Sequence, residues 1–340
     1  MDVTTYLLRT LFVHSEGTRL VLEGDAVKAL RDGAPSQRLP LNVIDGIVVL
    51  SGVDVSTPLL VRCGEDGRTV AFLSRFGKPK AIVEGPLSGR GHLRSLQHAR
   101  QADSASRDQL ACALVGGKLH QMAWGLRQWA RDVEPSLASI LRTQADALRD
   151  QESTLANASR QMALGVEGAG TRRYFDGLAR VLRYQEFEGR VRRPATDAVN
   201  ATLSMLYSLT RMAVHGAIHA SGLDPYCGYL HGDRDGQPSL VLDLMEEFRP
   251  VADRVAVSLF NKKRLVDRHF AIEVSGAVML TSEGREVVFS AWHEHRNQLV
   301  QVRTSKQPIP QAALPIVQAN LFANTLRSGQ PYLPLRLAVK

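Results

Sequence analysis

A histidine and two carboxylates stand close together in the sequence, around a short segment bounded by prolines. His231 precedes a loop, and Asp243 and Glu246 follow on a segment that begins at Pro238 and stops before Pro250. Proline is tolerated in the first turn of a helix and would stop a helix at its end, so this segment is predicted to be helical. Residues three apart share one face of a helix, which places both carboxylates together. An imidazole and two carboxylates at one spot suit a hard divalent cation, Mg²⁺ or Mn²⁺.

The rest of this predicted helix does not decide whether the carboxylates bind a metal. Leu240, Leu244 and Phe248 form its apolar stripe, and Glu247 lies about 100° further round the axis than Glu246. An acidic helix is often just a solvated face, and His231 is then a loop residue that only forms hydrogen bonds. Both interpretations fit the spacing.

A third ligand is needed for an open catalytic metal site, and Glu167 is a candidate. It stands in the glycine-rich stretch 165–170, which is predicted to be a break between helical runs at 153–164 and 171–187. Glycines let backbones approach closely, which could hold Glu167 deep between helices. Arg172 and Arg173 follow directly and could meet phosphate. The residues alone favour a simpler interpretation, a helix–helix turn with an exposed glutamate.

Other candidate motifs are weaker. His215 and His219 have the i, i+4 spacing of metal ligands but lack a third ligand nearby in the sequence. The run from His293 to His295 lacks the HExxH spacing, and residues 165–170 lack the Gly-Lys-Ser/Thr of a phosphate-binding loop. No nucleophilic serine or cysteine motif is found.

The elements that must position these residues change in type near residue 90. Residues 1–86 are predicted to be mostly β, with a hairpin turn at residues 15–17 and a short helix at 56–61. The predicted strands span residues 6–13, 19–22, 43–50 and 69–73. Several short strands at this spacing indicate a sandwich.

Beyond a Gly/Pro-rich linker at residues 84–91, the apolar period is helical. Helical patterns cover residues 108–131, 136–149, 153–164, 171–187, 196–221, 239–248 and 312–327. The sequence therefore predicts an α+β protein in which a small N-terminal β-sandwich domain (1–86) precedes a linker or helix (87–104). A larger all-α C-terminal domain (105–340) would hold the candidate metal and DNA-binding residues.

The charge of the chain is concentrated in its helical part. The net charge is +8, and residues 1–90 hold 11 Lys and Arg against 10 Asp and Glu. The excess of +7 therefore lies beyond residue 90, where a polyanion such as DNA would bind. The alternative is a basic protein with no such partner, and charge alone does not distinguish the two.

Length and composition exclude several classes of protein. With 340 residues, 44% hydrophobic and 22% charged, the chain is expected to fold as a packed globule rather than stay disordered. No apolar run reaches the roughly 18 residues of a membrane span, and no secretory signal pattern opens the sequence. Three widely spaced cysteines do not indicate a disulfide framework, which predicts a reducing, cytoplasmic location.

Long segments of the chain, in a consistent order, resemble one known family. The stretch Gly222-Leu-Asp-Pro to Gly228-Tyr-Leu-His231, followed by residues 238–250, resembles the signature of the CRISPR-associated endonuclease and integrase of spacer acquisition. Residues 193–204 resemble the family segment upstream of it. Further markers are found at residues 72–77, 85–86, 116–118 and 332–334. The N-terminal part looks like the variant of type I-C systems.

This resemblance implies a fold and a set of metal ligands. The fold of the family is an N-terminal β-sandwich followed by a helical domain, in agreement with the prediction from the residues. Its metal ligands correspond to Glu167, His231 and Glu246 in this sequence, with Asp243 as a further acidic contact. The same three ligands would be the catalytic residues, with Mg²⁺ or Mn²⁺ as the cofactor.

The resemblance also implies an activity and partners. The family joins the 3′-hydroxyl of a short DNA to a phosphodiester at a CRISPR array, and it cleaves branched DNA by related chemistry. It works on double-stranded and branched DNA as a homodimer, bridged by a small CRISPR-associated partner subunit into a larger adaptation complex. Residues 1–86, nearly neutral and without proposed ligands, are expected to mediate dimer formation.

Basic residues near the site are expected to bind phosphates without reading the base sequence. These are Arg172, Arg173, Arg192, Arg193, Arg249, Lys262, Lys263 and Arg264. Two other functions remain open from the sequence. One is a DNA-binding scaffold without catalysis, and the other is a metallohydrolase for small phosphoesters, which would not need the positive excess.

Overall fold

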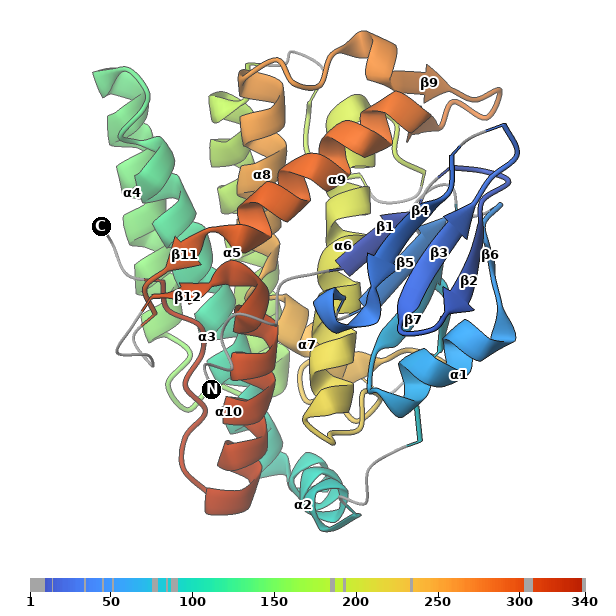
Figure 1. Ribbon diagram of the computed structural model, residues 1–340. Coiled ribbons are helices and arrows are strands. Elements are labelled where there is room, and N and C mark those ends of the chain that lie inside the picture. Colours follow the sequence, from blue (N-terminus) through green and yellow to red (C-terminus); the bar gives the residue numbers. More distant parts are fainter. Residues whose placement is uncertain are drawn as a thin grey trace.

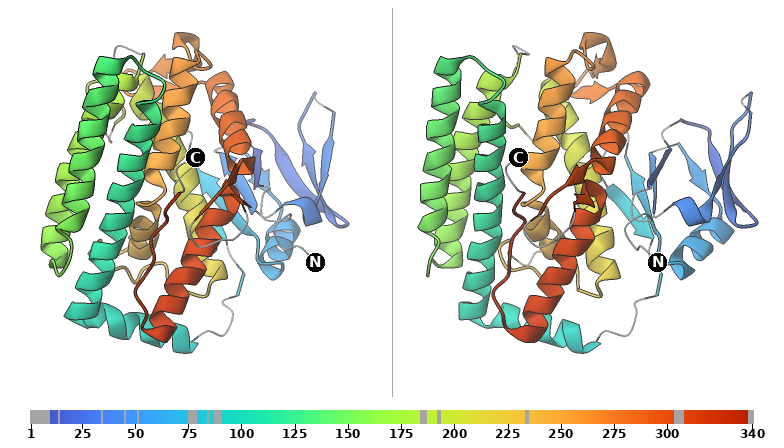
Figure 2. Two further views of the ribbon diagram at one scale, coloured as in Figure 1. Left: turned by 90° about the vertical axis from the view of Figure 1, so that its left-hand side faces the viewer. Right: turned by 60° about the vertical axis from the view of Figure 1, so that its left-hand side comes forward.

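The computed structural model describes residues 10–13, 15–33, 35–44, 46–50, 52–74, 79–83, 85–86, 91–183, 187–191, 194–232, 235–302 and 308–337. A small β region lies to one side of a larger set of helices (Figures 1 and 2). The molecule is therefore an α+β protein, in which a small N-terminal β region is followed by a helical domain, as the sequence predicted.

Two four-stranded sheets make up the β region, with strand orders β1-β5-β7-β8 and β4-β3-β2-β6. The strands are β1 (Thr10–Val13), β2 (Arg19–Glu23), β3 (Ala26–Leu30), β4 (Gln37–Pro40), β5 (Gly46–Leu50), β6 (Asp54–Val55), β7 (Thr69–Leu73) and β8 (Pro79–Val83). Helix α1 (Thr57–Glu65) lies on the connection from β6 to β7. Strands β3, β4 and β8 were not predicted from the sequence.

The predicted hairpin at residues 15–17 is wrong, because the strands on its two sides belong to different sheets. β1 pairs in parallel with β5, whereas β2 pairs with β3 and β6. The hairpin instead joins β2 and β3, in which Glu23 lies opposite Ala26. The two residues between them begin with Gly24 at φ +59°, a conformation that a two-residue turn requires and that glycine adopts freely.

The first sheet has two buried faces, which follow the two-residue period of its strands. Ile47 and Val70 point into the core of the sandwich, together with Leu20 of the second sheet. The alternate residues Ala71 and Leu73 of β7 belong to the main core of the helical domain. The β region is therefore packed against the helices along one whole sheet face.

The helical domain contains nine α-helices among the residues described. They are α2 (Gly91–Ala102), α3 (Ser104–Trp129), α4 (Pro135–Ser153), α5 (Arg160–Val181), α6 (Ala198–Ala220), α7 (Ser239–Met245), α8 (Arg249–Asn261), α9 (Ser282–Asn297) and α10 (Leu314–Ser328). The domain also includes two short two-stranded sheets, β9 (Phe270–Ile272) with β10 (Val278–Leu280) and β11 (Leu299–Val300) with β12 (Ile309–Pro310). Neither these sheets nor α8 and α9 were predicted.

Helix α5 corrects the prediction of a break at residues 165–170. The helix runs without interruption through these glycines. A Cβ on Gly170 would lie 2.3 Å from Leu119 Cδ2 of α3, and one on Gly177 would lie 2.6 Å from Leu126 Cδ2. These two glycines therefore serve close packing between helices rather than a turn. Glu167 stands on a rigid helix.

Pro250 also has a different role from the one predicted. Helix α7 has already ended at Met245, and Pro250 lies in the first turn of α8. Proline is suited to this position because its missing N–H has no partner there in any helix. The chain thus turns sharply between two helices, and Glu246 and Glu247 occupy that turn.

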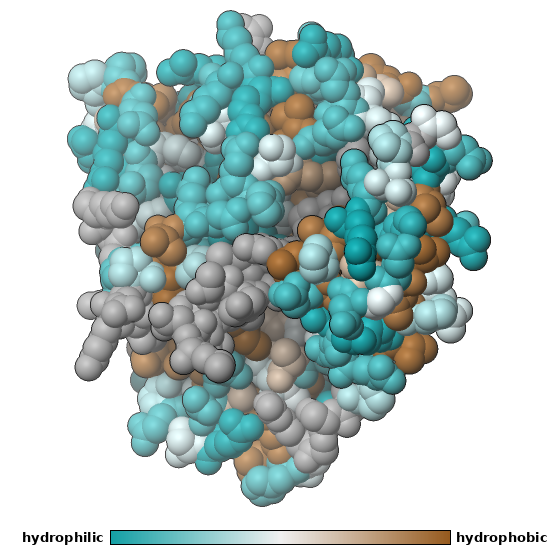
Figure 3. All heavy atoms as spheres, in the orientation of Figure 1, coloured by the Kyte–Doolittle hydropathy of each residue, from teal (hydrophilic) through white to brown (hydrophobic). Residues whose placement is uncertain are grey.

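Hydrophilic side chains predominate on the face seen in Figure 3, with hydrophobic ones scattered among them. The large apolar side chains are collected inside, where a core built from α3 to α10 includes Leu119, Leu206 and Phe322. Within the described parts of the chain, no helix combines the length and the apolar character that crossing a membrane requires.

Candidate functional site

The buried carboxylate of Asp243 holds the loop that carries His231. Asp243 Oδ2 accepts hydrogen bonds from the backbone N–H groups of Tyr229 at 2.5 Å and Leu230 at 2.9 Å. Asp243 Oδ1 accepts one from the backbone N–H of His231 at 2.9 Å and lies 2.7 Å from His231 Nδ1. A carboxylate can only accept, so Nδ1 carries a proton, and Nε2 is the ring nitrogen left for a metal. Asp243 therefore orients an imidazole whose Nε2 is able to bind a metal.

The loop can approach Asp243 this closely because residue 228 is a glycine. A Cβ on Gly228 would lie 2.6 Å from Ser239 Cβ and 3.0 Å from Asp243 Oδ2. At the other end of the loop, Gly222 follows the end of α6 with φ +76°, a conformation that glycine often adopts after a helix. The glycines thus fix the path of the loop on which His231 stands.

Glu167 and Glu246 meet at the ammonium of Lys118. Lys118 Nζ forms an ion pair with Glu167 Oε1 and lies 2.5 Å from Glu246 Oε2. The Lys118 side chain is 2% exposed, and that of Glu246 is 4% exposed. Thr171, one turn along α5, donates a further hydrogen bond to Glu167 Oε1 at 3.0 Å. Two proposed metal ligands from distant segments are therefore held around one buried cation.

Glu246 is kept ionised by its neighbours despite its burial. Burial alone would raise its pKa, but Arg249 and Lys118 outweigh that effect and lower the pKa of Glu246 to about 2. Arg249 Nε donates to Glu246 Oε1 at 2.7 Å. His231 also contributes to lowering this pKa, so its imidazole lies near the same carboxylate.

Glu247 faces away from this cluster, in the turn that follows α7. It accepts hydrogen bonds from Tyr332 Oη at 2.7 Å, from Gln318 Nε2 at 3.0 Å and from the backbone N–H of Leu335 at 2.5 Å. Burial raises the pKa of Glu247 to about 7, and these hydrogen bonds offset only part of the rise. Glu247 thus anchors the C-terminal segment rather than the site.

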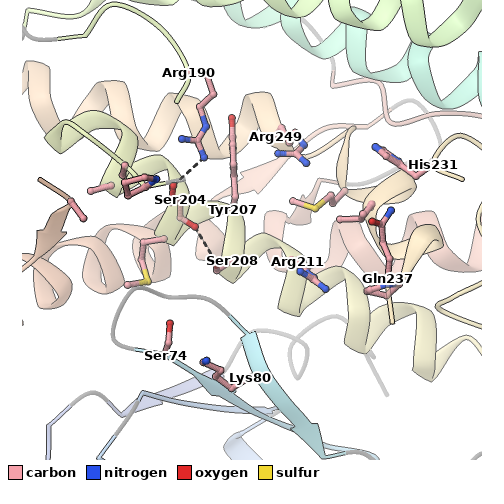
Figure 4. Close-up of a pocket in the computed structure, with 18 of the residues that line it drawn as sticks. Ser74, Lys80, Arg190, Ser204, Tyr207, Ser208, Arg211, His231, Gln237 and Arg249 are labelled. Atoms are coloured by element: carbon pink, nitrogen blue, oxygen red, sulfur yellow. Dashed lines mark hydrogen bonds between the residues drawn. The ribbon is translucent and has the colours of Figure 1, made fainter. Parts of the chain in front are cut away.

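A groove of about 1580 Å³ opens beside His231 and Arg249. It extends between the helical domain and the β region, where Ser74 and Lys80 form the opposite wall from Arg211 (Figure 4). Among the described residues, the basic side chains that line it are Lys80, Arg160, Arg190, Arg211 and Arg249, and the one acidic side chain is Glu273. The wall of the groove is therefore strongly positive.

An aromatic ring stands between two of these arginines. The ring of Tyr207 on α6 has the Cζ of Arg249 at 4.8 Å from its centroid and that of Arg190 at 5.2 Å (Figure 4). Its hydroxyl donates to Asp253 Oδ1 at 2.6 Å. Cation–π contacts of this kind fix the guanidinium groups in place. Arg249 is thus held between the ring and Glu246.

The basic residues predicted to bind DNA are spread over different surfaces. Arg249 lines the groove. Arg172 and Arg173 are exposed on α5, and Lys262 and Lys263 are exposed after α8. Arg264 is engaged by Glu294, with its two guanidinium nitrogens 2.7 and 3.0 Å from the carboxylate oxygens. Arg192 and Arg193 lie outside the described residues.

Sequence reasoning did not assign a role to several residues of the site. Lys118 carried a signal, because it interrupts an apolar helical stripe between Val115 and Leu119 in a segment quoted as a family marker. Its partners could not be inferred, since Glu167 is 49 positions away. Arg190 and Arg211 carried no comparable signal.

The types of side chain at the site suit a divalent cation, although they are not arranged in a complete coordination geometry. Among the described residues, no group of three or more His, Cys, Asp or Glu side chains is already arranged to hold a metal. The two carboxylates nevertheless converge on one cation, the ammonium of Lys118, and His231 offers Nε2 near Glu246. Carboxylate oxygens and an imidazole nitrogen suit Mg²⁺ or Mn²⁺. The other histidine pair, His215 and His219, likewise belongs to no group of three or more such side chains in the parts described.

The fold and site define an α+β protein in which a buried pair of carboxylates lies behind a basic groove that His231 and Arg249 line. Residues 11–294 match the family model described as CRISPR associated protein Cas1. A protein of Rhodospirillum rubrum named CRISPR-associated endonuclease Cas1 2 is 36% identical over 342 residues, covering 96% of this chain and 98% of that protein. CRISPR-associated endonuclease Cas1 1 of Moorella thermoacetica is 34% identical over 336 residues, covering 96% and 98%. This chain belongs to the Cas1 family.

Solved structures share the fold over nearly the whole chain. A Cas1 protein from Thermotoga maritima has a TM-score of 0.82 at 22% identity, covering 95% of this chain and 99% of that one. A casposase bound to an integration product also has a TM-score of 0.82, at 19% identity, covering 96% and 93%. The family identification from the sequence is confirmed, and the type I-C variant stays a prediction.

Proposed function

We propose that this chain is a metal-dependent DNA endonuclease and integrase that inserts short foreign DNA fragments as new spacers into a CRISPR array. One observation carries the proposal: Glu167 and Glu246 converge on a single buried cation, and Glu246 is ion-paired with Arg249, which lines a basic groove together with His231. The names of the relatives support it, since they are CRISPR-associated endonucleases. A structural neighbour that is a casposase bound to an integration product fits the joining reaction.

In this proposal Glu167, Glu246 and Nε2 of His231 hold Mg²⁺ or Mn²⁺. The bound metal would polarise a phosphodiester and stabilise the oxyanion that leaves. Asp243 is better suited to positioning than to ligation, because its two oxygens already accept from three backbone N–H groups and the imidazole. Fixing the tautomer and the ring orientation of a ligand is a typical role of such a carboxylate.

The groove supplies the positive charge that DNA requires. Arg249 stands next to Glu246, so a phosphate that reaches the carboxylates would also meet a guanidinium fixed against Tyr207. Arg190, Arg211 and Lys80 continue the positive wall away from the site. These residues would bind the backbone of double-stranded or branched DNA and bring a 3′-hydroxyl and a target phosphodiester together.

Partners are proposed on the same basis. Structural neighbours include a complex named Cas6-RT-Cas1–Cas2, which supports a small CRISPR-associated partner subunit for this chain.

We further propose that the β region, residues 1–86, mediates a homodimer. Its first sheet is buried against the helical domain, so the dimer contact would use the second sheet, whose edge strand β4 is exposed. Lys80 shows that the β region also contributes to the groove.

The experiment replaces the proposed ligands one at a time with alanine and measures cleavage and joining of branched DNA in Mg²⁺ or Mn²⁺. We expect Glu167→Ala, His231→Ala and Glu246→Ala each to lose activity while still folding and binding DNA. Glu152→Ala is the matched control, because Glu152 is also a largely buried, ion-paired glutamate but contacts Arg149 and Arg336 instead.

Near-normal activity in any two of the three variants would refute the ligand assignment. Activity of the unaltered protein that persists in a chelator would refute metal dependence. Salt-dependent DNA binding without any cleavage or joining would favour a non-catalytic scaffold.

A further inference from the structure

We propose that Lys118 is an internal counter-cation of the metal site. Its ammonium holds Glu167 and Glu246 together in the metal-free protein, and a divalent metal ion binds by displacing that ammonium from the carboxylates. The inference rests on the proposed function, since it concerns two of the proposed ligands. It assigns Lys118 as a positioning residue that acts through them.

The burial of Lys118 is the first argument. It stands in the middle of α3, the longest helix described, with Leu114, Val115 and Leu119 buried around it. Burying an ammonium is very unfavourable unless opposite charges compensate for the lost water. The compensation here comes from Glu167 and Glu246, both of which lie at hydrogen-bonding distance from Nζ. The lysine is therefore built into the site.

The charge balance of the cluster is the second argument. Lys118 and Arg249 together carry two positive charges, and Glu167 and Glu246 carry two negative ones, so the four groups are neutral as a set. Both oxygens of Glu246 already face a cation, Oε1 facing Arg249 and Oε2 facing Lys118. A divalent ion added to this arrangement would meet an ammonium at close range and leave a net charge of +2. Since like charges at such distances repel strongly in a buried site, the ion and the ammonium compete for the same oxygens.

The geometry allows this exchange without disturbing the helices. Lysine carries its charge on a flexible four-carbon stem, so the ammonium can move while α3 and α5 stay packed. Gly170 fixes those two helices against each other through Leu119, the residue after Lys118. A DNA phosphate in the groove would compensate the added positive charge. Metal and DNA are therefore expected to bind cooperatively, each raising the affinity for the other.

The test measures binding of Mn²⁺ to the full chain by calorimetry, in the absence of DNA. Lys118→Met keeps the length of the side chain and removes its charge. We expect this variant to bind Mn²⁺ at least about ten-fold more tightly than the unaltered protein, because the competing charge is gone. In a chelator, the same variant should unfold at a lower temperature, since the buried carboxylate of Glu246 and the partly buried one of Glu167 have lost a partner.

Two further variants complete the design. Arg285→Met removes another buried cation, whose guanidinium donates to the carbonyl of Leu280 in β10 and to the hydroxyl of Ser282 in α9. This variant should be less stable but should bind Mn²⁺ with unchanged affinity. Lys118→Gln keeps a neutral hydrogen-bond donor for the carboxylates and should fold even where Lys118→Met does not. It too should bind Mn²⁺ more tightly.

Unchanged or weaker Mn²⁺ binding in the Lys118 variants would overturn the inference and make Lys118 a purely structural residue. Should both variants fail to fold, the Mn²⁺ affinity of the unaltered protein is measured with and without DNA. Equal affinities would also overturn the inference. A failure of the proposed function gives a different result. In that case the unaltered protein binds no Mn²⁺ at all, with or without DNA.

Discussion

Glu246 and Glu247 are neighbours in the chain, both fully buried, and their surroundings differ completely. Glu246, in the turn after α7, faces the candidate site, where its oxygens lie 2.5 Å from Lys118 Nζ and 2.7 Å from Arg249 Nε. Two positive partners outweigh burial and hold its pKa at about 2. The carboxylate of Glu246 is therefore charged at neutral pH.

Glu247 faces the C-terminal segment, where its three partners are neutral. Tyr332, Gln318 and the backbone of Leu335 donate hydrogen bonds to it, but they supply no full positive charge. Burial consequently dominates and raises the pKa of Glu247 to about 7. The comparison shows that the charge of the partners, rather than the degree of burial, separates a carboxylate kept ready for a cation from one that fastens a segment.

The largest expected effect tests this division directly. Glu246→Gln removes the charge that faces Lys118 and should lower DNA cleavage and joining by about a hundred-fold or more, if the metal contributes several kcal/mol to the transition state. Glu247→Gln keeps the shape and the neutral partners, so its rate should stay within about three-fold of normal. Rates on branched DNA in Mn²⁺ provide the measurement. Equal losses in both variants would remove the distinction between the two sides of the helix.

Asp253 extends the comparison to a third buried carboxylate. Burial raises its pKa from 3.8 to about 6, and the hydroxyl of Tyr207 and the charge of Arg249 offset only part of the rise. A carboxyl that holds its proton more tightly when folded contributes stability below about pH 4 and loses it as the pH rises through 6.

Asp253→Asn cannot titrate, so the unaltered protein should lose up to about 3 kcal/mol of unfolding free energy relative to the variant between pH 4 and pH 7. Urea unfolding at several pH values measures the difference. If the difference in unfolding free energy stayed constant across this range, Asp253 would have an ordinary pKa. Burial without a sufficient positive partner would then not raise the pKa of this carboxyl.

The smallest effect concerns one hydrogen bond on the Glu247 side. Tyr332→Phe removes a hydroxyl that donates to Glu247 and accepts from Gln318 at 2.9 Å. The loss should be about 1 kcal/mol of unfolding free energy, with faster hydrogen exchange at the N–H of Leu335. Tyr226→Phe is the control, since Tyr226 is exposed. Equal stability in the two variants would show that the C-terminal segment does not depend on the hydroxyl.

The part of the site that could be predicted from the sequence is local. Pro238 correctly predicted the start of the short helix, but the helix ends at Met245, so the turn that follows it separates Glu246 from Glu247. The family resemblance supplied the fold and pointed to Glu167, whose role as a ligand stays a proposal. These features depend on residues close together in the chain or on long motifs.

What could not be predicted depends on contacts between distant segments. Gly170 indicates a break when α5 is considered alone, and only the side chain of Leu119 from α3 explains why glycine is needed inside a helix. The pairing of β1 with β5 rather than β2 is likewise a contact between separate segments. The same holds for Lys118, because the sequence does not show which carboxylates pair with a lysine in an apolar stripe. Its partners are known only once Glu167 of α5 and Glu246 after α7 are placed beside it.

The C-terminal segment has a consequence for the order in which the protein is made. The N–H of Leu335 that satisfies Glu247 is 88 residues further along the chain, and Pro334 packs where Gly117 leaves room, next to Lys118. A ribosome adding about 5–20 residues per second makes this partner roughly 4–18 s after Glu247. During that interval Glu247, in the turn after α7, lacks this hydrogen bond. The candidate site is therefore expected to become rigid only when synthesis has reached residue 335, so that incomplete chains carry the proposed ligands but not the support that holds them.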